Sequence, residues 1–333
     1  MRCTPRNGAA PHPTEREPAG VALHSSPSMP MDQASTLRQI VGQQNRAASP
    51  PAARASKLRV IAVTSGKGGV GKTNIVLNLG LALSRLGRRV FLLDADMGLA
   101  NVDVLLGMTP RYTLAHVLSG QKELLDIALD VSPGFKVLPA SSGIAELTEL
   151  SYEQQMELFR ALSTLDVDMD YLFIDTGAGI SSNVLRFNAS AQEIILIVNP
   201  EPTSITDVYA LMKLLSIKYH LRAFDLIANS VLSEEEGLGV YERLSKVATH
   251  FLNVQLRYLG SVPLDKSLAK AVRQQRPLLE LFPAAPASRA LLRIAALLDQ
   301  PSPGVPPVLS SATPAHPTDS TFWDRLLHWK RVK

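Results

Sequence analysis

A glycine-rich segment at residues 66–73 constrains the fold of this chain more than any other feature. It stands between a short apolar run, residues 59–63, and a helical stretch, residues 74–85. Its members are Gly66, Lys67, Gly68, Gly69, Val70, Gly71, Lys72 and Thr73. The spacing G-x-x-x-x-G-K-T between a strand and a helix is that of a phosphate-binding loop, whose backbone N–H groups surround an anion. The sequence therefore predicts an α/β domain built around this loop.

Three residues of the loop have predicted roles. We expect Lys72 to reach the β- and γ-phosphates of a nucleotide and the Thr73 hydroxyl to coordinate Mg²⁺. The N-terminus of the following helix adds positive potential beside the anion. Lys67 is not needed by an ordinary phosphate loop, so its presence is the informative departure from the general pattern.

Short apolar runs rich in β-branched residues recur through residues 57–300. They are typical of strands buried on both faces and lie at 59–63, 90–93, 171–174, 194–198, 226–228 and 258–262. Helical stretches separate most of them, and two start with capping-box spacing, Ser151 with Gln154 and Ser204 with Asp207. We therefore predict an α/β fold, a doubly wound and mostly parallel sheet with helices on both faces, whose ligand binds beyond the carboxyl ends of the strands.

Proline and charge set two terminal segments apart from this domain. Eight of the 23 prolines lie in residues 1–56 and six in residues 301–319. Residues 57–300 have a net charge of −1, so the overall charge of +4 comes from the ends and gives no support for a DNA-binding face. Segments with few large apolar residues cannot offset the entropy lost on ordering. We expect a disordered extension at 1–30, linkers at 46–56 and 301–319, and a domain at 57–300.

Cysteine usage and hydropathy exclude several classes of protein. The single cysteine, Cys3, rules out an internal disulfide framework and a cysteine-cluster metal site within one chain. No apolar stretch approaches the roughly 18 residues of a spanning helix, and no signal-peptide core is present. We therefore expect a cytoplasmic protein.

Acidic residues close two of the predicted strands. Asp94 and Asp96 end the second, and Asp175 ends a hydrophobic strand before the turn at residues 176–179. Carboxylates at the carboxyl ends of neighbouring strands can hold water-ligated Mg²⁺ or orient an attacking water. The sequence predicts that these acids complete a phosphate-transfer site, the alternative being that they only cap the turns that follow.

The form Lys-Gly-Gly-Val-Gly-Lys-Thr resembles the deviant Walker A ATPases, the family of MinD and ParA. Residues 96–103 resemble the MinD switch segment, and residues 173–179 resemble Walker B. The resemblance implies a slow ATPase that uses ATP and Mg²⁺ and forms a homodimer on ATP binding. By this resemblance the catalytic residues are Lys67, which reaches the phosphates bound by the other copy in the dimer, Lys72, which binds phosphate, and Asp96, which positions the hydrolytic water. The residues implied to hold the metal are Thr73, Asp94 and Asp175.

Base recognition has weaker support. The resemblance implies that Asn229 and Pro263 contact adenine, the alternative being that each is only a turn residue. No Asn-Lys-x-Asp motif for reading guanine is present, which favours ATP over GTP.

Residues 32–38 resemble a narrower group. They match the Asp-Gln-Ala-x-x-Leu-Arg motif of the flagellar number regulators FlhG/FleN, and the Asp-Thr-Gly-Ala-Gly-Ile-Ser sequence at 175–181 is typical of the same group. The resemblance implies that this motif stimulates FlhF, a signal-recognition-type GTPase, and that a flagellar transcriptional activator is a further partner. We expect a partner-binding helix at 31–45 that folds on FlhF, or else one docked on its own domain. Its predicted contacts are Asp32, Gln33, Leu37 and Arg38, with Gln33 orienting water in the partner's site.

Residues 320–333 hold both tryptophans of the chain and four basic residues. On a helix the apolar arc would comprise Phe322, Trp323, Leu326, Leu327 and Trp329. Aromatic residues at the headgroup boundary and Lys/Arg near anionic lipid are typical of an interfacial anchor, and MinD and FlhG have similar tails. We predict an amphipathic helix that binds the inner face of the cell membrane reversibly, with higher avidity in the ATP dimer. The alternative is a docked core helix.

Together these features predict a MinD-type ATPase that regulates flagellar number and placement. A MinD- or ParA-type ATPase that positions a division site or cargo is the first alternative. The second is an ATP-dependent amide-forming enzyme of the dethiobiotin-synthetase type, which would leave residues 32–38 and the terminal aromatic residues unexplained.

Overall fold

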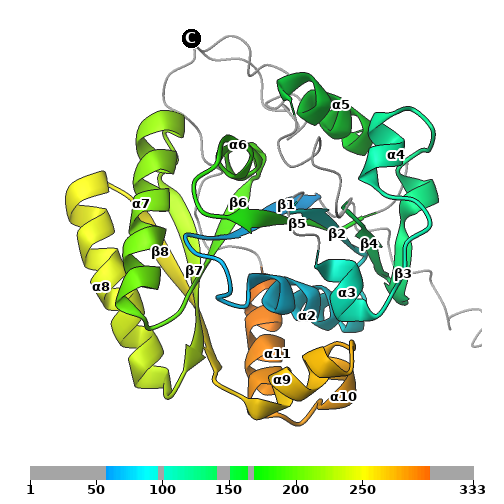
Figure 1. Ribbon diagram of the computed structural model, residues 1–333. Helices are drawn as coiled ribbons and strands as arrows, with labels where there is room; N and C mark the ends of the chain where they lie inside the picture. The colour runs from blue at the N-terminus through cyan, green and yellow to red at the C-terminus, as the bar shows by residue number, and fades with distance from the viewer. Residues whose placement is uncertain (1–57, 97–100, 141–150, 164–168, 301–333) are drawn as a thin grey trace, which may run out of the picture. The chain divides into compact units, whose positions relative to one another are not determined.

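The computed structural model describes residues 58–96, 101–140, 151–163 and 169–300. These residues form one eight-stranded sheet with helices around it (Figure 1). The strand order is β3-β4-β2-β5-β1-β6-β7-β8. All neighbouring strands are parallel except β3 and β4. The strands are β1 (Arg59–Ser65), β2 (Val90–Ala95), β3 (Leu129–Ser132), β4 (Phe135–Leu138), β5 (Tyr171–Ala178), β6 (Glu193–Val198), β7 (Ala223–Val231) and β8 (Gln255–Pro263).

Helices cover both faces of the sheet, as Figure 1 shows. Alternate residues of β1 identify the two layers: Ile61 and Val63 pack in a core with α2 and α11, whereas Ala62 packs in one with α7 and α8. The helices are α2 (Lys72–Arg85), α3 (Val102–Leu106), α4 (Leu114–Leu118), η1 (Leu125–Ile127), α5 (Tyr152–Ser163), α6 (Ser182–Ser190), α7 (Pro202–Tyr219), α8 (Glu234–Leu252), α9 (Lys266–Arg273), α10 (Leu278–Leu281) and α11 (Pro286–Leu298).

The predicted fold class and the six predicted strands are confirmed. Every one of those apolar runs lies within a parallel strand, and β1, β2 and β6 are buried along almost their whole length. Burial on both faces explains why the runs are continuous rather than alternating. The carboxyl ends of β1, β2 and β5 consequently meet at one edge of the sheet.

Two features of the fold differ from the sequence prediction. The antiparallel β3–β4 hairpin was not predicted, because β3 is partly exposed and lacks a continuous apolar run. The second predicted capping box is wrong: α7 begins at Pro202 after the N-cap Glu201, and the Ser204 hydroxyl instead accepts a hydrogen bond from Asn199 N at 3.1 Å. Proline at the first helical position, with its preset φ, explains the earlier start.

The other capping box is confirmed. Ser151 and Gln154 exchange backbone-to-side-chain hydrogen bonds of 2.8 and 3.2 Å at the start of α5. The predicted segments 1–30, 31–45, 46–56, 301–319 and 320–333 lie outside the described residues. Among the helices that the structure describes, none has the length and apolar character needed to cross a membrane.

Candidate nucleotide site

The glycine-rich loop connects β1 to α2 and forms the floor of a cleft of about 700 Å³. Gly71 adopts φ +89°, a left-handed conformation that only glycine takes without strain. Gly66 is required for another reason: a Cβ there would lie 2.2 Å from the backbone carbon of Asp207 in α7. The wall is completed by the ends of β1, β2 and β5 and by residues of α2, α6 and α9, among them Ser65, Lys72, Thr73, Ala95, Asp96, Gly177, Asn183 and Val272.

Lys72 and Asp175 form a buried ion pair in this cleft. Lys72 Nζ lies 2.6 Å from Asp175 Oδ1, and the two side chains are 7% and 1% exposed. Burial raises the pKa of Asp175, while Lys72 and a hydrogen bond with Thr73 act to lower it. The predicted phosphate-binding and metal-binding residues are therefore in direct contact.

Asp94 lies beside this pair on the neighbouring strand, in register with Asp175. Burial, together with the nearby Asp175 carboxylate, raises the pKa of Asp94 to about 8. The two hydrogen bonds that it accepts, from Asp96 N at 3.1 Å and Val102 N at 3.4 Å, compensate only in part. A second positive charge near Asp94 would stabilise its ionised form.

The residues at this edge fit Mg²⁺. Two buried carboxylates and one hydroxyl provide the oxygen ligands that this cation prefers, and one lysine leaves their negative charge incompletely compensated. Thr73, Asp94 and Asp175 would hold the ion directly or through water. When bound, Mg²⁺ supplies charge neutralisation at the phosphates.

Asp96 follows β2 and lines the same cleft. A Cβ on Gly177 would lie 3.6 Å from Asp96 Oδ1, an ordinary contact distance that places the carboxylate beside the end of β5. The predicted water-positioning residue thus lies next to the turn that follows Asp175. Residues 97–100 of the predicted switch segment lie outside the described residues.

Lys67 points away from the buried carboxylates. Its Nζ lies 3.1 Å from Glu201 Oε2 and 3.4 Å from Thr203 Oγ1, and the Lys67 and Glu201 side chains are 45% and 58% exposed. An exposed ion pair of this kind contributes little to stability. Lys67 can therefore leave Glu201 for another anion at low cost.

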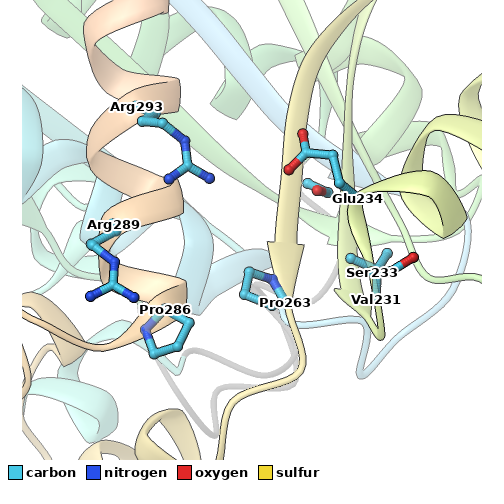
Figure 2. Close-up of a pocket in the computed structure, with 8 residues that line it drawn as sticks. Val231, Ser233, Glu234, Pro263, Pro286, Arg289 and Arg293 are labelled. Atoms are coloured by element: carbon cyan, nitrogen blue, oxygen red, sulfur yellow. The ribbon is translucent and has the colours of Figure 1, made fainter.

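Asn229 and Pro263, the predicted adenine contacts, occupy different surroundings. Asn229 is 3% exposed, and its Nδ2 donates to Val70 O at 2.7 Å, so it supports the phosphate loop in this structure. Pro263 instead lines a smaller pocket of about 210 Å³ at the end of β8 (Figure 2). Adenine contact by either residue remains a prediction.

Sequence reasoning missed the arginines of that smaller pocket. Arg289 and Arg293 lie one turn apart on α11 and line it together with Glu234 across β8 (Figure 2). Arg289 Nη1 donates to Ala284 O at 2.8 Å. Nothing in the sequence distinguishes these arginines from solvated ones, because the folding of α11 against β8 brings them to this site.

Comparison with known proteins places this geometry in a family. A ParA model described as "NUBPL iron-transfer P-loop NTPase" matches residues 57–298. The antiactivator FleN of Pseudomonas aeruginosa is 49% identical over 250 residues, covering 75% of this chain and 89% of FleN. The flagellum site-determining protein YlxH of Helicobacter pylori is 37% identical over 241 residues, covering 72% and 81%.

A solved structure shows the same architecture. The septum site-determining protein MinD of Pyrococcus horikoshii, in complex with Mg-ADP, is 26% identical and superposes with a TM-score of 0.62, covering 73% of this chain and 96% of that one. The residues matched to the family model contain no cysteine ligand for an iron–sulfur cluster. The chain belongs to the MinD/ParA family of P-loop ATPases, which use ATP and Mg²⁺, and within it resembles the antiactivator FleN and the flagellum site-determining protein YlxH.

Proposed function

We propose that this ATPase is a nucleotide-driven switch that regulates the number and placement of flagella. The 49% identity to FleN, extending over 89% of that protein, carries the proposal. The similarity to YlxH, a flagellum site-determining protein, supports it independently. Counting flagella by electron microscopy in a deletion strain tests the role, and an unchanged count would contradict it.

The proposed switch depends on a homodimer that encloses two ATP molecules. Lys67 supports this model, because it is half exposed and its Nζ contacts the exposed Glu201 and Thr203 rather than a buried group. In the dimer it exchanges Glu201 for the phosphates bound by the other copy. Light scattering with a non-hydrolysable ATP analogue should show a doubled mass for the wild type and a monomer for Lys67→Ala; equal masses with and without the analogue would exclude the dimer.

Within each copy, Lys72 and Asp96 have separate tasks. Lys72 exchanges Asp175 for the β- and γ-phosphates, which leaves Asp175 available to the metal shell. Asp96 accepts a hydrogen bond from the attacking water and orients it toward the γ-phosphorus. Asp96→Ala is expected to bind ATP but to stay trapped as a dimer, and normal hydrolysis by this variant would overturn the assignment.

We also propose that the dimer binds membranes through residues 320–333. One amphipathic helix of this kind binds weakly, whereas two in a dimer bind together with greater avidity. Co-sedimentation with anionic liposomes should be stronger with ATP than with ADP, and Trp323→Ala should weaken it. Equal binding in both nucleotide states would contradict an ATP-controlled anchor and the proposed reversible membrane localisation.

Residues 31–45 are proposed to stimulate the GTPase FlhF, with Gln33 orienting its attacking water. A synthetic 31–45 peptide should raise FlhF turnover, and a Gln33→Ala peptide should not. Full stimulation by the altered peptide would exclude the role of Gln33. A transcriptional activator is the remaining proposed partner, since the relative FleN is named an antiactivator.

A further inference from the structure

The tip of the phosphate loop is not held in place by packing. A Cβ added at Gly68 or Gly69 would meet no heavy atom within 4 Å. Gly66, at the base of the loop, is packed so closely against α7 that a Cβ there has no room. Glycine permits many backbone conformations, so ordering an unpacked pair of glycines costs entropy. Residues 67–69 therefore depend on hydrogen bonds for a fixed conformation.

Ser65, the last residue of β1, provides such a bond. Its side chain is buried, and its Oγ donates to Lys67 O at 2.9 Å. Within the part of the chain that the structure describes, this is the one hydrogen bond made to the backbone of residues 67–69. Ser65 is itself fixed, because its own backbone oxygen accepts from Gly179 N at 2.9 Å in the turn after β5. The loop tip is thus anchored through a residue that belongs to the sheet.

The bond from Ser65 acts on the residue that carries the signature lysine side chain. Lys67 Nζ contacts Glu201 and Thr203 at the start of α7, and the side chain is 45% exposed. A flexible four-carbon stem leaves the loop in the direction that its backbone sets. A hydrogen bond to the carbonyl of Lys67 restricts that backbone, so Ser65 determines the direction in which the lysine leaves the loop.

We propose that Ser65 is a positioning residue for Lys67. The proposal rests on the proposed dimer, in which Lys67 reaches the phosphates bound by the other copy. By ordering the loop tip before the second copy arrives, Ser65 reduces the conformational entropy lost on association. Lys72 and Thr73 belong to α2, and Lys72 is also held by Asp175, so the binding of nucleotide within one copy depends less on Ser65.

Ser65→Ala in the full-length chain tests the positioning role. With a non-hydrolysable ATP analogue, the protein concentration at half-maximal dimerisation should rise about tenfold or more by light scattering. Each copy loses one hydrogen bond worth about three- to tenfold, and a dimer contains two copies. The affinity of the monomer for a fluorescent ADP analogue should change by less than about threefold. A separation of these two quantities distinguishes the positioning of Lys67 from general damage to the nucleotide site.

The outcomes separate this inference from the proposed dimer. If the wild type dimerises and Ser65→Ala dimerises at the same concentration, the role of Ser65 is wrong and the dimer stands. If the wild type stays monomeric with the analogue, the dimer is wrong and the role of Ser65 falls with it. A loss of ADP affinity as large as the loss of dimerisation would also overturn the inference.

Two further variants complete the test. If Ser65→Ala fails to fold by circular dichroism, the similarly sized Ser65→Cys, whose thiol is only a weak donor, takes its place with the same outcomes. Ser288→Ala on α11 is the matched control. Ser288 is buried and its hydroxyl donates to Phe282 O at 2.7 Å, so the control removes the same kind of bond outside the cleft and should dimerise as the wild type does.

Discussion

The central sheet carries one cluster of charged side chains at the amino ends of its strands and another at the carboxyl ends. The two clusters differ in their ratio of positive to negative charges. At the amino ends of the strands, three arginines meet three carboxylates: Arg59, Arg88, Arg257, Glu193, Asp225 and Asp299. We call this set the amino-end cluster. At the carboxyl ends, one lysine meets three carboxylates: Lys72, Asp94, Asp96 and Asp175. We call this set the carboxyl-end cluster.

The amino-end cluster is internally satisfied. Arg59 and Glu193 are joined by two hydrogen bonds of 2.7 and 2.6 Å, and Arg257 and Asp225 by two of the same lengths. Arg59 also donates to Leu298 O, which ties the end of α11 to the start of β1. Bidentate pairs of this kind fix geometry and need no further ligand. This cluster holds the domain together.

The carboxyl-end cluster is short of positive charge. Burial raises the pKa of both Asp94 and Asp175, and a neighbouring carboxylate adds to each shift, Asp175 to that of Asp94 and Asp96 to that of Asp175. Burial also raises the pKa of Asp225 in the amino-end cluster, but there Arg257 donates two hydrogen bonds to the same carboxylate. The carboxyl-end cluster gains stability when a cation and its nucleotide bind. The two clusters show that the ratio of positive to negative charges, rather than burial alone, distinguishes a ligand-binding site from a cluster that only stabilises the fold.

The largest effect should come from Lys72→Ala in the carboxyl-end cluster. Removing the only lysine of the cluster eliminates the phosphate contact and leaves Asp175 buried without its cation. We expect nucleotide affinity to fall at least about a hundredfold, because charge-assisted contacts to buried groups are worth several kcal/mol. Titration with a fluorescent ATP analogue measures this affinity. An unchanged affinity would contradict the assignment of the carboxyl-end cluster as the nucleotide site.

Asp94→Asn should stabilise the metal-free protein. Between its unfolded pKa of 3.8 and its folded pKa of about 8, Asp94 keeps its proton only in the folded state, so stability falls as pH rises through this window. Asparagine cannot ionise and should flatten this part of the pH profile, raising the free energy of unfolding at pH 8 by a few kcal/mol. Urea denaturation between pH 4 and 8 without Mg²⁺ measures it; a profile as steep as that of the wild type would contradict the raised pKa.

Arg59→Leu should have the opposite effect in the amino-end cluster. It removes the bidentate partner of Glu193, so we expect the free energy of unfolding to fall by about 1–3 kcal/mol. Affinity for ATP should stay unchanged, since the cluster lies at the other edge of the sheet. Lys136→Ala, which breaks the exposed Lys136–Asp130 pair, is the control and should change stability by less than about 1 kcal/mol. A loss of ATP affinity in Arg59→Leu would show that the two edges are coupled.

The smallest effect is expected for Glu201→Gln. It frees Lys67 from an exposed ion pair worth about 0.2–1 kcal/mol, so the ATP-analogue concentration at half-maximal dimerisation should fall at most about fivefold. Light scattering across a nucleotide titration measures it, with Glu242→Gln on α8 as a control outside the cleft. A change in the opposite direction would mean that Glu201 supports the dimer rather than restraining Lys67.

Much of the nucleotide site could be predicted because its parts have local signals. The phosphate loop is contiguous in the chain, and Asp94 and Asp175 each end an apolar run. The rule that parallel strands present their carboxyl ends at one edge then brings these residues together. In the structure Lys72 Nζ lies 2.6 Å from Asp175 Oδ1, so the phosphate loop and β5 meet at the carboxyl ends of the strands.

Other residues left no such signal. The Asn229 amide donates to Val70 O, a contact across 159 positions of the chain that no local pattern indicates; its contact with the base stays a prediction. Gln155 and Asn183 are ordinary polar residues of amphipathic helices until α5 packs on α6. The hairpin of β3 and β4 was missed because β3 is a short edge strand that lacks the continuous apolar pattern of buried strands.

Local order in this protein follows from neighbours along the chain. Glycine at positions of positive φ specifies the loop, an apolar run of sufficient length specifies the strand, and an acid at the end of that run specifies the ligand. None of these depends on the rest of the fold. Contacts between side chains that are distant in the sequence depend instead on which strands are adjacent and how the helices pack on them. Hydrogen bonds and ion pairs act over only a few ångströms, so the balance of charge at each end of the strands and the pairing of Gln155 with Asn183 arise only in the tertiary structure.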